Sequence, residues 1–175
     1  MDTERETELK SETGTAGRPD WLARWRGDTV DASDAELREI LATTRTIAVV
    51  GIKNQASEDA CRIPLYMQEQ GYRILPVNPK LESAIGVPAV AVLGALDEPV
   101  DLVSLFRASD HIPRHVEEIL AMSPRPKAVW MQLGIHNGAA SAALRAAGIH
   151  VVQDRCIMVD HKRLLGEGAS PAPLP

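Results

Sequence analysis

Basic residues and glycines follow the short apolar runs of this sequence. The runs end in Gly51-Ile52-Lys53, Val77-Asn78-Pro79-Lys80, Phe106-Arg107, Gln132-Leu133-Gly134 and Asp154-Arg155-Cys156. The whole chain has a formal net charge of -5, so Lys and Arg at these positions stand out from an acidic background. If the runs are parallel strands, their carboxyl ends meet at one edge of the sheet, and these residues could bind an anionic ligand there.

Gly51 closes the first apolar run, TIAVV. A glycine at this place lets a phosphate approach the backbone and the N-terminus of the next helix. The G-x-G-x-x-G fingerprint is absent, because GIKNQASEDACR holds a single glycine. The tight pyrophosphate turn of an ordinary NAD domain is therefore not encoded, and a glycine that ends a strand without any ligand is an equal alternative.

The second apolar run ends in Asn78, Pro79 and Lys80. NAD domains usually carry Asp or Glu here, which accepts hydrogen bonds from the ribose hydroxyls. Lys80 could instead neutralise a phosphate on that ribose, which a carboxylate would repel. Coenzyme A and NADP both carry such a phosphate. A turn stiffened by Pro79, with Lys80 solvated, is the other interpretation of these residues.

Cys156, Asp160 and His161 lie close in sequence, which raises the question of a nucleophile with its base or of metal ligands. Their spacing fits no established metal pattern, and we predict neither a catalytic nor a metal role. His136 is either a helix-start residue near a ligand or an exposed loop histidine. With Cys61 far away and no Cys-x-x-Cys motif, both cysteines are expected to be reduced thiols.

Short apolar runs alternate with helical patterns from residue 46 onward, as in a parallel sheet buried on both faces. We predict an α/β fold: a single Rossmann-like domain with a doubly wound, mainly parallel sheet of five or six strands and an N-terminal helical extension. The strand order should reverse at the third main strand. The predicted strands are 46–51, 72–77, 101–106, 127–132 and 149–152, with a weak strand near Val90, and the predicted helices begin at the caps Ser33, Asp110 and Asn137 and cover 61–70.

Four segments follow from this pattern. Residues 1–19 are expected to form a disordered tail, because they offer almost no large apolar side chain for burial. Residues 20–45 form the helical extension, in which Trp21 and Trp25 could pack on the domain or on a second subunit, giving a homodimer. Residues 46–165 form the nucleotide-binding domain, and residues 166–175 form a flexible C-terminal tail.

Composition argues against several partners. The acidic balance and the 3% aromatic content do not suit nucleic acid or an anionic membrane surface, which require clustered Lys and Arg or stacking rings. No stretch has the length of a membrane span or the apolar centre of a signal peptide. We therefore expect a cytoplasmic protein whose partner is a small-molecule nucleotide.

Four runs, GYRILPVNP, VDLVSLFR, AVWMQLGI and AGIHVVQDRCIMVDHKRL, occur in an order and spacing that resemble the CoA-binding domain family, which is related to succinyl-CoA synthetase α subunits. The resemblance covers about residues 34–165 and implies a Rossmann-like fold with CoA or acyl-CoA across the point where strand order reverses. It implies that Gly51, Ile52 and Lys53 contact the diphosphate; Val77, Asn78, Pro79 and Lys80 the adenosine and ribose phosphate; Phe106 and Arg107 the switch-point wall; and Gln132 and Gly134 the pantetheine. Arg155 belongs to the final motif of the family.

The sequence departs from the family pattern after the first strand. Many members have Ser, then Pro and Arg, where this chain has Lys53, Ala56 and Glu58, followed by Asp59. Two acids beside a diphosphate are unfavourable unless they point away, cap the helix, or pair with Lys53 and Arg62. The synthetases also carry a phosphorylated histidine in a second domain that has no counterpart here.

These features predict a stand-alone module that binds CoA or acyl-CoA and has no evident catalytic machinery. They favour a binding protein over an enzyme. One alternative is an NADP- or NAD-binding oxidoreductase or redox sensor, for which no hydride site can be placed. The other is a structural or interaction domain with a vestigial nucleotide cleft.

Overall fold

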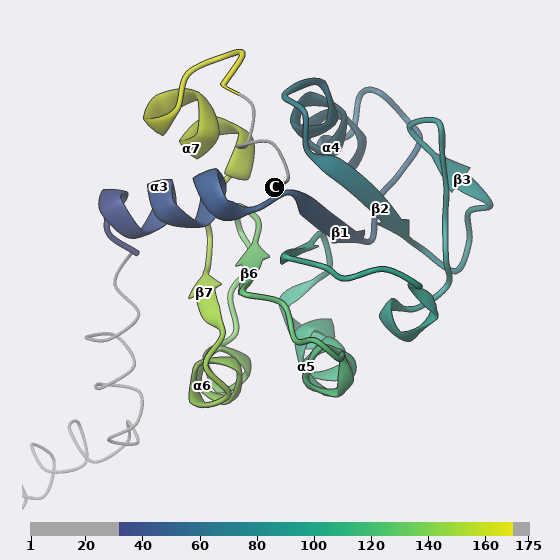
Figure 1. The fold of residues 1–175 in the computed structure, drawn as a ribbon. Helices are drawn as coiled ribbons and strands as arrows, with labels where there is room; N and C mark the ends of the chain where they lie inside the picture. Colours follow the sequence, from purple (N-terminus) through teal and green to yellow (C-terminus); the bar gives the residue numbers. More distant parts are fainter. Residues whose placement is uncertain (1–31, 170–175) are drawn as a thin grey trace, which may run out of the picture. The chain divides into compact units, whose positions relative to one another are not determined.

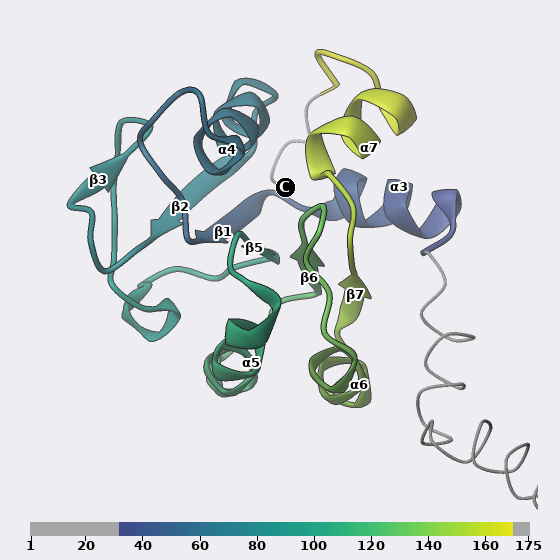
Figure 2. The ribbon, with the colours of Figure 1, turned by 180° about the vertical axis from the view of Figure 1, so that it is seen from behind.

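Five parallel strands form the central sheet of the computed structural model, which describes residues 32–169. Their order is β2-β1-β5-β6-β7 (Figure 1; β5 is labelled in Figure 2). The strands are β1 (Thr46–Val50), β2 (Arg73–Val77), β5 (Leu102–Leu105), β6 (Ala128–Met131) and β7 (His150–Val152). Val90 adds an isolated parallel bridge beside Val77 on the outer side of β2, at the place of the predicted weak strand. The doubly wound, Rossmann-like fold is therefore confirmed.

Helices cover both faces of this sheet. The helices α3 (Asp34–Thr43), α4 (Asp59–Glu69) and α7 (Ile157–Leu164) lie on one face, and α5 (Ile112–Ala121) and α6 (Gly138–Ala146) lie on the other, as both views show (Figure 1, Figure 2). Between β2 and β5 the chain forms the small antiparallel pair β3 (Ser83–Ala84) and β4 (Val87–Pro88) and the short helix η1 (Leu93–Ala95). A second short helix, η2 (Ser109–His111), precedes α5.

The apolar core is divided between the two faces by the alternation of side chains along each strand. In β1, Ala48 and Val50 belong to the cluster that packs under α5 and α6, whereas Ile47 and Val49 belong to the cluster under α3, α4 and α7. All four residues of β5 and of β6 are buried. This two-sided burial is the reason that the strands appear in the sequence as continuous apolar runs.

Two of the three predicted helix caps are confirmed. The Ser33 Oγ accepts a hydrogen bond from the Glu36 N–H at 3.2 Å, and the Asn137 Oδ1 accepts one from the Ala140 N–H at 2.9 Å. The prediction that Asp110 caps the next helix is wrong. The chain first turns through η2, so α5 begins beyond Asp110 and its N-cap, His111, makes no side-chain cap hydrogen bond.

The strand order reverses between β1 and β5, as predicted. After β1 the chain adds β2 and the Val90 bridge on one side, then returns to place β5 on the other side of β1. Where the connections from two neighbouring strands leave in opposite directions, a crevice opens beyond the carboxyl ends of those strands. Ligands of open α/β sheets bind in this crevice. In this chain the crevice lies beyond Val50 and Leu105.

The segment with Trp21 and Trp25 and the tail of residues 1–19 lie outside the described residues, so the predictions made for them stay predictions. Within residues 32–169, every helix is too short or too polar to cross a membrane.

Candidate nucleotide-binding site

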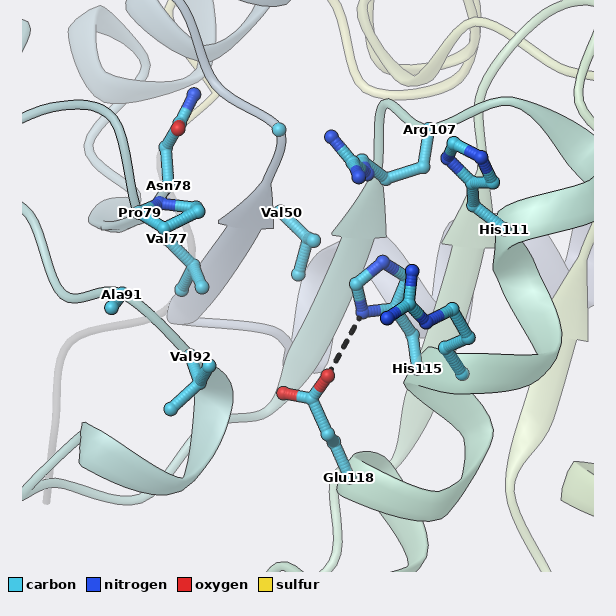
Figure 3. A pocket seen from close by; sticks show the side chains of 12 residues that line it. Val50, Val77, Asn78, Pro79, Ala91, Val92, Arg107, His111, His115 and Glu118 are labelled. Carbon is cyan, nitrogen blue, oxygen red and sulfur yellow. Dashed lines mark hydrogen bonds and ion pairs between the residues drawn. The ribbon is translucent and has the colours of Figure 1, made fainter.

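A cavity of about 280 Å³ opens at the switch point, between the carboxyl ends of β1 and β2 and the helix α5. Figure 3 shows the side chains that point into it from both sides. One wall is largely apolar and comes from the strand ends and the segment before η1, and the other is basic and comes from the end of β5 and from α5. The lining residues are Val50, Gly51, Val77, Asn78, Pro79, Ala91, Val92, Arg107, His111, Arg114, His115 and Glu118.

Gly51 allows the end of β5 to approach β1 closely. Its φ is +81°, and a Cβ there would lie 2.3 Å from the carbonyl oxygen of Phe106. The Gly51 N–H donates to the Val77 carbonyl at 2.9 Å, so this amide is used within the sheet. The missing side chain therefore lets the two strand ends lie close together at the cavity, and the predicted contact of Gly51 with a diphosphate stays a prediction.

Asn78 connects three segments at the rim of the cavity. Its side-chain Nδ2 donates to the Ile52 carbonyl at 2.8 Å, and its Oδ1 accepts a hydrogen bond from the Lys80 N–H at 2.9 Å. Its backbone N–H donates to the Val90 carbonyl at 2.9 Å. The loops after β1 and β2 are thus held in fixed positions beside Pro79, and Lys80 is carried at the exposed end of this turn.

Four basic residues line the opposite wall, and Figure 3 shows Arg107 and His115 directed into the cavity, with His111 beside Arg107 at its margin. The Arg107 Nε is buried and has no hydrogen-bond partner within residues 32–169. Burial lowers the pKa of His115, and the guanidinium groups of Arg107 and Arg114 lower it further, although the Glu118 carboxylate opposes them. This wall is therefore basic while His115 itself tends to stay neutral.

Lys80, Arg107 and Arg114 are set apart from the other cations of the described chain. Across residues 32–169, they are the Lys and Arg side chains that make no hydrogen bond or ion pair. Arg107 and Arg114 line the cavity, and Lys80 follows its lining residue Pro79. In the part of the chain that the structure describes, positive charge without a partner is thus gathered at the sheet edge where open α/β sheets bind their ligands.

The two acids of the loop after β1 are paired with neighbouring cations. Glu58 lies 3.1 Å from the Lys53 Nζ, and Asp59 lies 2.6 Å from the Arg62 guanidinium. Pairing with Lys53 and Arg62 is one of the arrangements in which two acids can lie beside a bound diphosphate. The ion pair with Glu58 also engages the Lys53 ammonium group, and the side chain of Ile52 is fully buried. Neither Lys53 nor Ile52 lines the cavity.

The predicted residues on the far side of the switch point also lie outside the cavity lining. Gln132 is buried, where its Nε2 donates to the Ser104 Oγ at 3.0 Å and its Oε1 accepts from the Ile157 N–H at 3.2 Å. The Gly134 N–H donates to the Asp154 carboxylate at 2.6 Å. Their role toward a ligand stays a prediction.

Phe106 and Arg155 are likewise held by protein contacts. Phe106 packs against the cluster under α3, α4 and α7. The Arg155 guanidinium forms two hydrogen bonds to the Asp160 carboxylate, at 2.7 and 2.8 Å. Neither residue lines the cavity, and a ligand role for them also stays a prediction.

Cys156, Asp160 and His161 start or belong to α7, a helix that the sequence analysis did not predict. Burial would raise the pKa of Asp160, but hydrogen bonds from Arg155 and Arg163 outweigh it and hold that pKa below its usual value. The His161 ring contacts the Tyr66 hydroxyl at 2.9 Å and the Ala169 carbonyl at 3.2 Å. Asp160 and His161 therefore hold α7 in place, and residues 32–169 contain no cluster suited to a metal.

Sequence reasoning missed the contribution of η2, which supplies His111 to the cavity, and of α5, which supplies Arg114, His115 and Glu118. A signal was present, because 111 and 115, and 114 and 118, are each four residues apart and so share one helix face. Combined with the rule that the helix after the switch-point strand borders the crevice, this spacing would have identified them.

The doubly wound sheet and the basic cavity at its switch point define a Rossmann-like nucleotide-binding domain. Residues 45–162 match the family described as CoA binding domain. The chain belongs to this family, and the resemblance found in its sequence motifs is confirmed.

Three relatives match over nearly their whole length. The uncharacterized protein YneT of Bacillus subtilis (strain 168) is 39% identical over 129 residues, which cover 74% of this chain and 94% of YneT. A solved structure from Thermus thermophilus, cell-free ID.343, is 46% identical with a TM-score of 0.72 and covers 76% of this chain and 99% of its own. A hypothetical protein from Pyrococcus horikoshii OT3 is 33% identical with a TM-score of 0.74, covering 77% and 94%.

Proposed function

We propose that the cavity and the sheet edge around it bind coenzyme A or an acyl-CoA, and that the chain acts in the cytoplasm as a stand-alone binding module. The observation that carries the proposal is the set of cations that have no partner among the described residues, Lys80, Arg107 and Arg114, at the switch point of a CoA binding domain. Catalysis is not part of the proposal.

The residues present suit the chemistry of this ligand. CoA joins a flat adenine base to three phosphate groups and a long thiol arm. The apolar wall formed by Val50, Val77 and Val92 can pack against a base, and the guanidinium groups of Arg107 and Arg114 can hold phosphates through paired N–H donors. The buried Arg107 Nε, which has no partner in the described chain, is a donor that such an anion would satisfy.

The size of the cavity indicates that it holds only part of the ligand. Sites for whole small molecules usually occupy roughly 300–1,000 Å³, and the cavity of about 280 Å³ lies just below this range. We infer that it takes the adenosine end, while the rest of the molecule lies along the strand ends toward Gly134. In this arrangement Lys80, on the exposed rim, faces the phosphate on the ribose.

Calorimetric titration with CoA and with dephospho-CoA, which lacks the ribose phosphate, tests the assignment. Arg114→Gln should weaken CoA about tenfold or more, because a hydrogen bond to a charged group is lost. Lys80→Ala should weaken CoA more than dephospho-CoA. Lys127→Ala is the matched control, because Lys127 precedes β6 at the opposite edge of the sheet, where it pairs with Asp101.

Two results would contradict the proposal. If the Lys127 variant loses as much affinity as the Arg114 variant, binding is a general charge effect and not a property of the cavity. If Lys80→Ala weakens both ligands equally, Lys80 does not contact the ribose phosphate.

A further inference from the structure

Glu118 is the acidic residue among the side chains that line the otherwise basic cavity. It projects from α5 and is fixed at both oxygens: Oε2 accepts a hydrogen bond from the Leu93 N–H at 3.2 Å, and Oε1 lies 3.2 Å from the Nδ1 of His115. Figure 3 shows this carboxylate beyond the His115 ring, on the side away from Arg107. The cavity therefore has a cationic part and a separate anionic part.

The contacts of Glu118 define what its carboxylate can still do. A carboxylate can only accept hydrogen bonds, so the Nδ1 of His115 carries the hydrogen in this pair. Each carboxylate oxygen has two lone pairs, and each is used once by the protein. The group therefore keeps free acceptor capacity toward the cavity, and it repels phosphate, which places the phosphates of a ligand at the Arg107 side.

The neighbouring wall is suited to a flat aromatic group. Val50, Val77, Ala91 and Val92 line the cavity from the strand side, and Figure 3 shows the valines facing Glu118 and His115 across the space between them. A flat base packed on this wall would turn its edge toward α5. The Glu118 carboxylate can only accept hydrogen bonds, so that edge of the base must carry a hydrogen-bond donor.

We propose that Glu118 selects an amino-bearing purine, accepting a hydrogen bond from the exocyclic amino group of adenine and rejecting an oxopurine, whose carbonyl oxygen would face the carboxylate. The inference rests on the function proposed for this cavity and adds its base specificity. His115 acts as a positioning residue, since it holds the Glu118 carboxylate through Oε1.

The test compares adenosine 3′,5′-bisphosphate with inosine 3′,5′-bisphosphate by calorimetry on the full chain. The two nucleotides carry the same phosphates, so their affinity ratio isolates the base. The wild type should favour the adenosine compound by about 10- to 100-fold, as expected for one hydrogen bond to a charged group. In Glu118→Gln the ratio should fall close to one, because an amide can accept from the amino group or donate to the carbonyl.

Glu117→Gln is the matched control, because Glu117 is the next residue of α5, is exposed and does not line the cavity; its ratio should equal that of the wild type. A ratio measured within one protein also cancels any general loss of affinity from the broken Leu93 contact. Equal affinities in the wild type, or an unchanged ratio in Glu118→Gln, would overturn the inference. Binding of neither bisphosphate would overturn it too, and a CoA titration of the same sample then shows whether the proposed function fails with it.

Discussion

Replacing Gly51 with alanine should destabilise the protein strongly, because two independent penalties act at this position. The residue has a φ of +81°, a region that costs an L-residue about 1–2 kcal/mol. The new Cβ would also lie 2.3 Å from the Phe106 carbonyl oxygen and 3.0 Å from the Arg107 Cδ. The carbonyl belongs to the backbone, and Phe106 is anchored to β1 because its N–H donates to the Val50 carbonyl at 2.9 Å. Relieving the overlap means separating β1 from β5, for which about 1–3 kcal/mol is typical of overpacking.

The sum predicts a decrease of about 2–5 kcal/mol in the free energy of unfolding, measured by urea denaturation followed by circular dichroism. Gly148→Ala supplies the comparison, because Gly148 has a φ of +82° and a Cβ there would meet nothing within 4 Å. It should cost only the conformational part, about 1–2 kcal/mol. Equal destabilisation by both variants would refute the steric reasoning. A stable Gly51→Ala protein that has lost CoA affinity would instead show that the glycine serves the ligand.

Two further predictions concern the rim and the helix α7. Asn78→Ala should lower the free energy of unfolding by about 1–3 kcal/mol in urea denaturation, because it removes the hydrogen bonds to the Ile52 carbonyl and from the Lys80 N–H. Asn54→Ala removes one exposed hydrogen bond to the Ser83 carbonyl and should cost less. Equal losses would contradict the role of Asn78 in holding the loops after β1 and β2. Burial holds the pKa of His161 in the folded chain below its ordinary value of 6.5. As the pH falls from about 7 to about 5.5, the unfolded chain therefore binds a proton before the folded chain does, and the free energy of unfolding should decrease. His161→Gln should flatten this slope, and an unchanged slope would show that His161 does not titrate in this way.

Much of the fold could be predicted because its strands are buried on both faces. The runs at 47–50, 102–105 and 128–131 are almost wholly apolar for that reason, and short polar caps at Ser33 and Asn137 marked two helix starts. The helix α7 could not be found in the same way, because the residues that it buries include Asp160 and His161. The burial of His161 depends on its contact with Tyr66, which is 95 positions away in the sequence, so no local pattern reveals this partner.

The candidate site could be predicted where it depends on chain position and not where it depends on packing. Asn78, Pro79 and Arg107 line the cavity because they follow strands at the switch point. The α5 wall was missed although its signal was present, because the spacing of its polar residues was not combined with the burial of Ile112, Val116 and Ile119 on the other side of the helix. The hydrogen bonds of Gln132 could not be predicted, because its partners Ser104 and Ile157 are distant in the sequence.

The most direct measurement of the central claim is a calorimetric titration of the unmodified chain with CoA, NADPH and NAD at one fixed salt concentration. We predict saturable binding of CoA, weaker binding of NADPH and the weakest binding of NAD, because Lys80, Arg107 and Arg114 offer charge to a phosphorylated ribose that NAD lacks. Saturation by NADPH without any CoA binding would indicate an oxidoreductase or redox sensor. Absence of binding by all three would indicate a vestigial cleft, and either result would contradict the assignment of this cavity to coenzyme A.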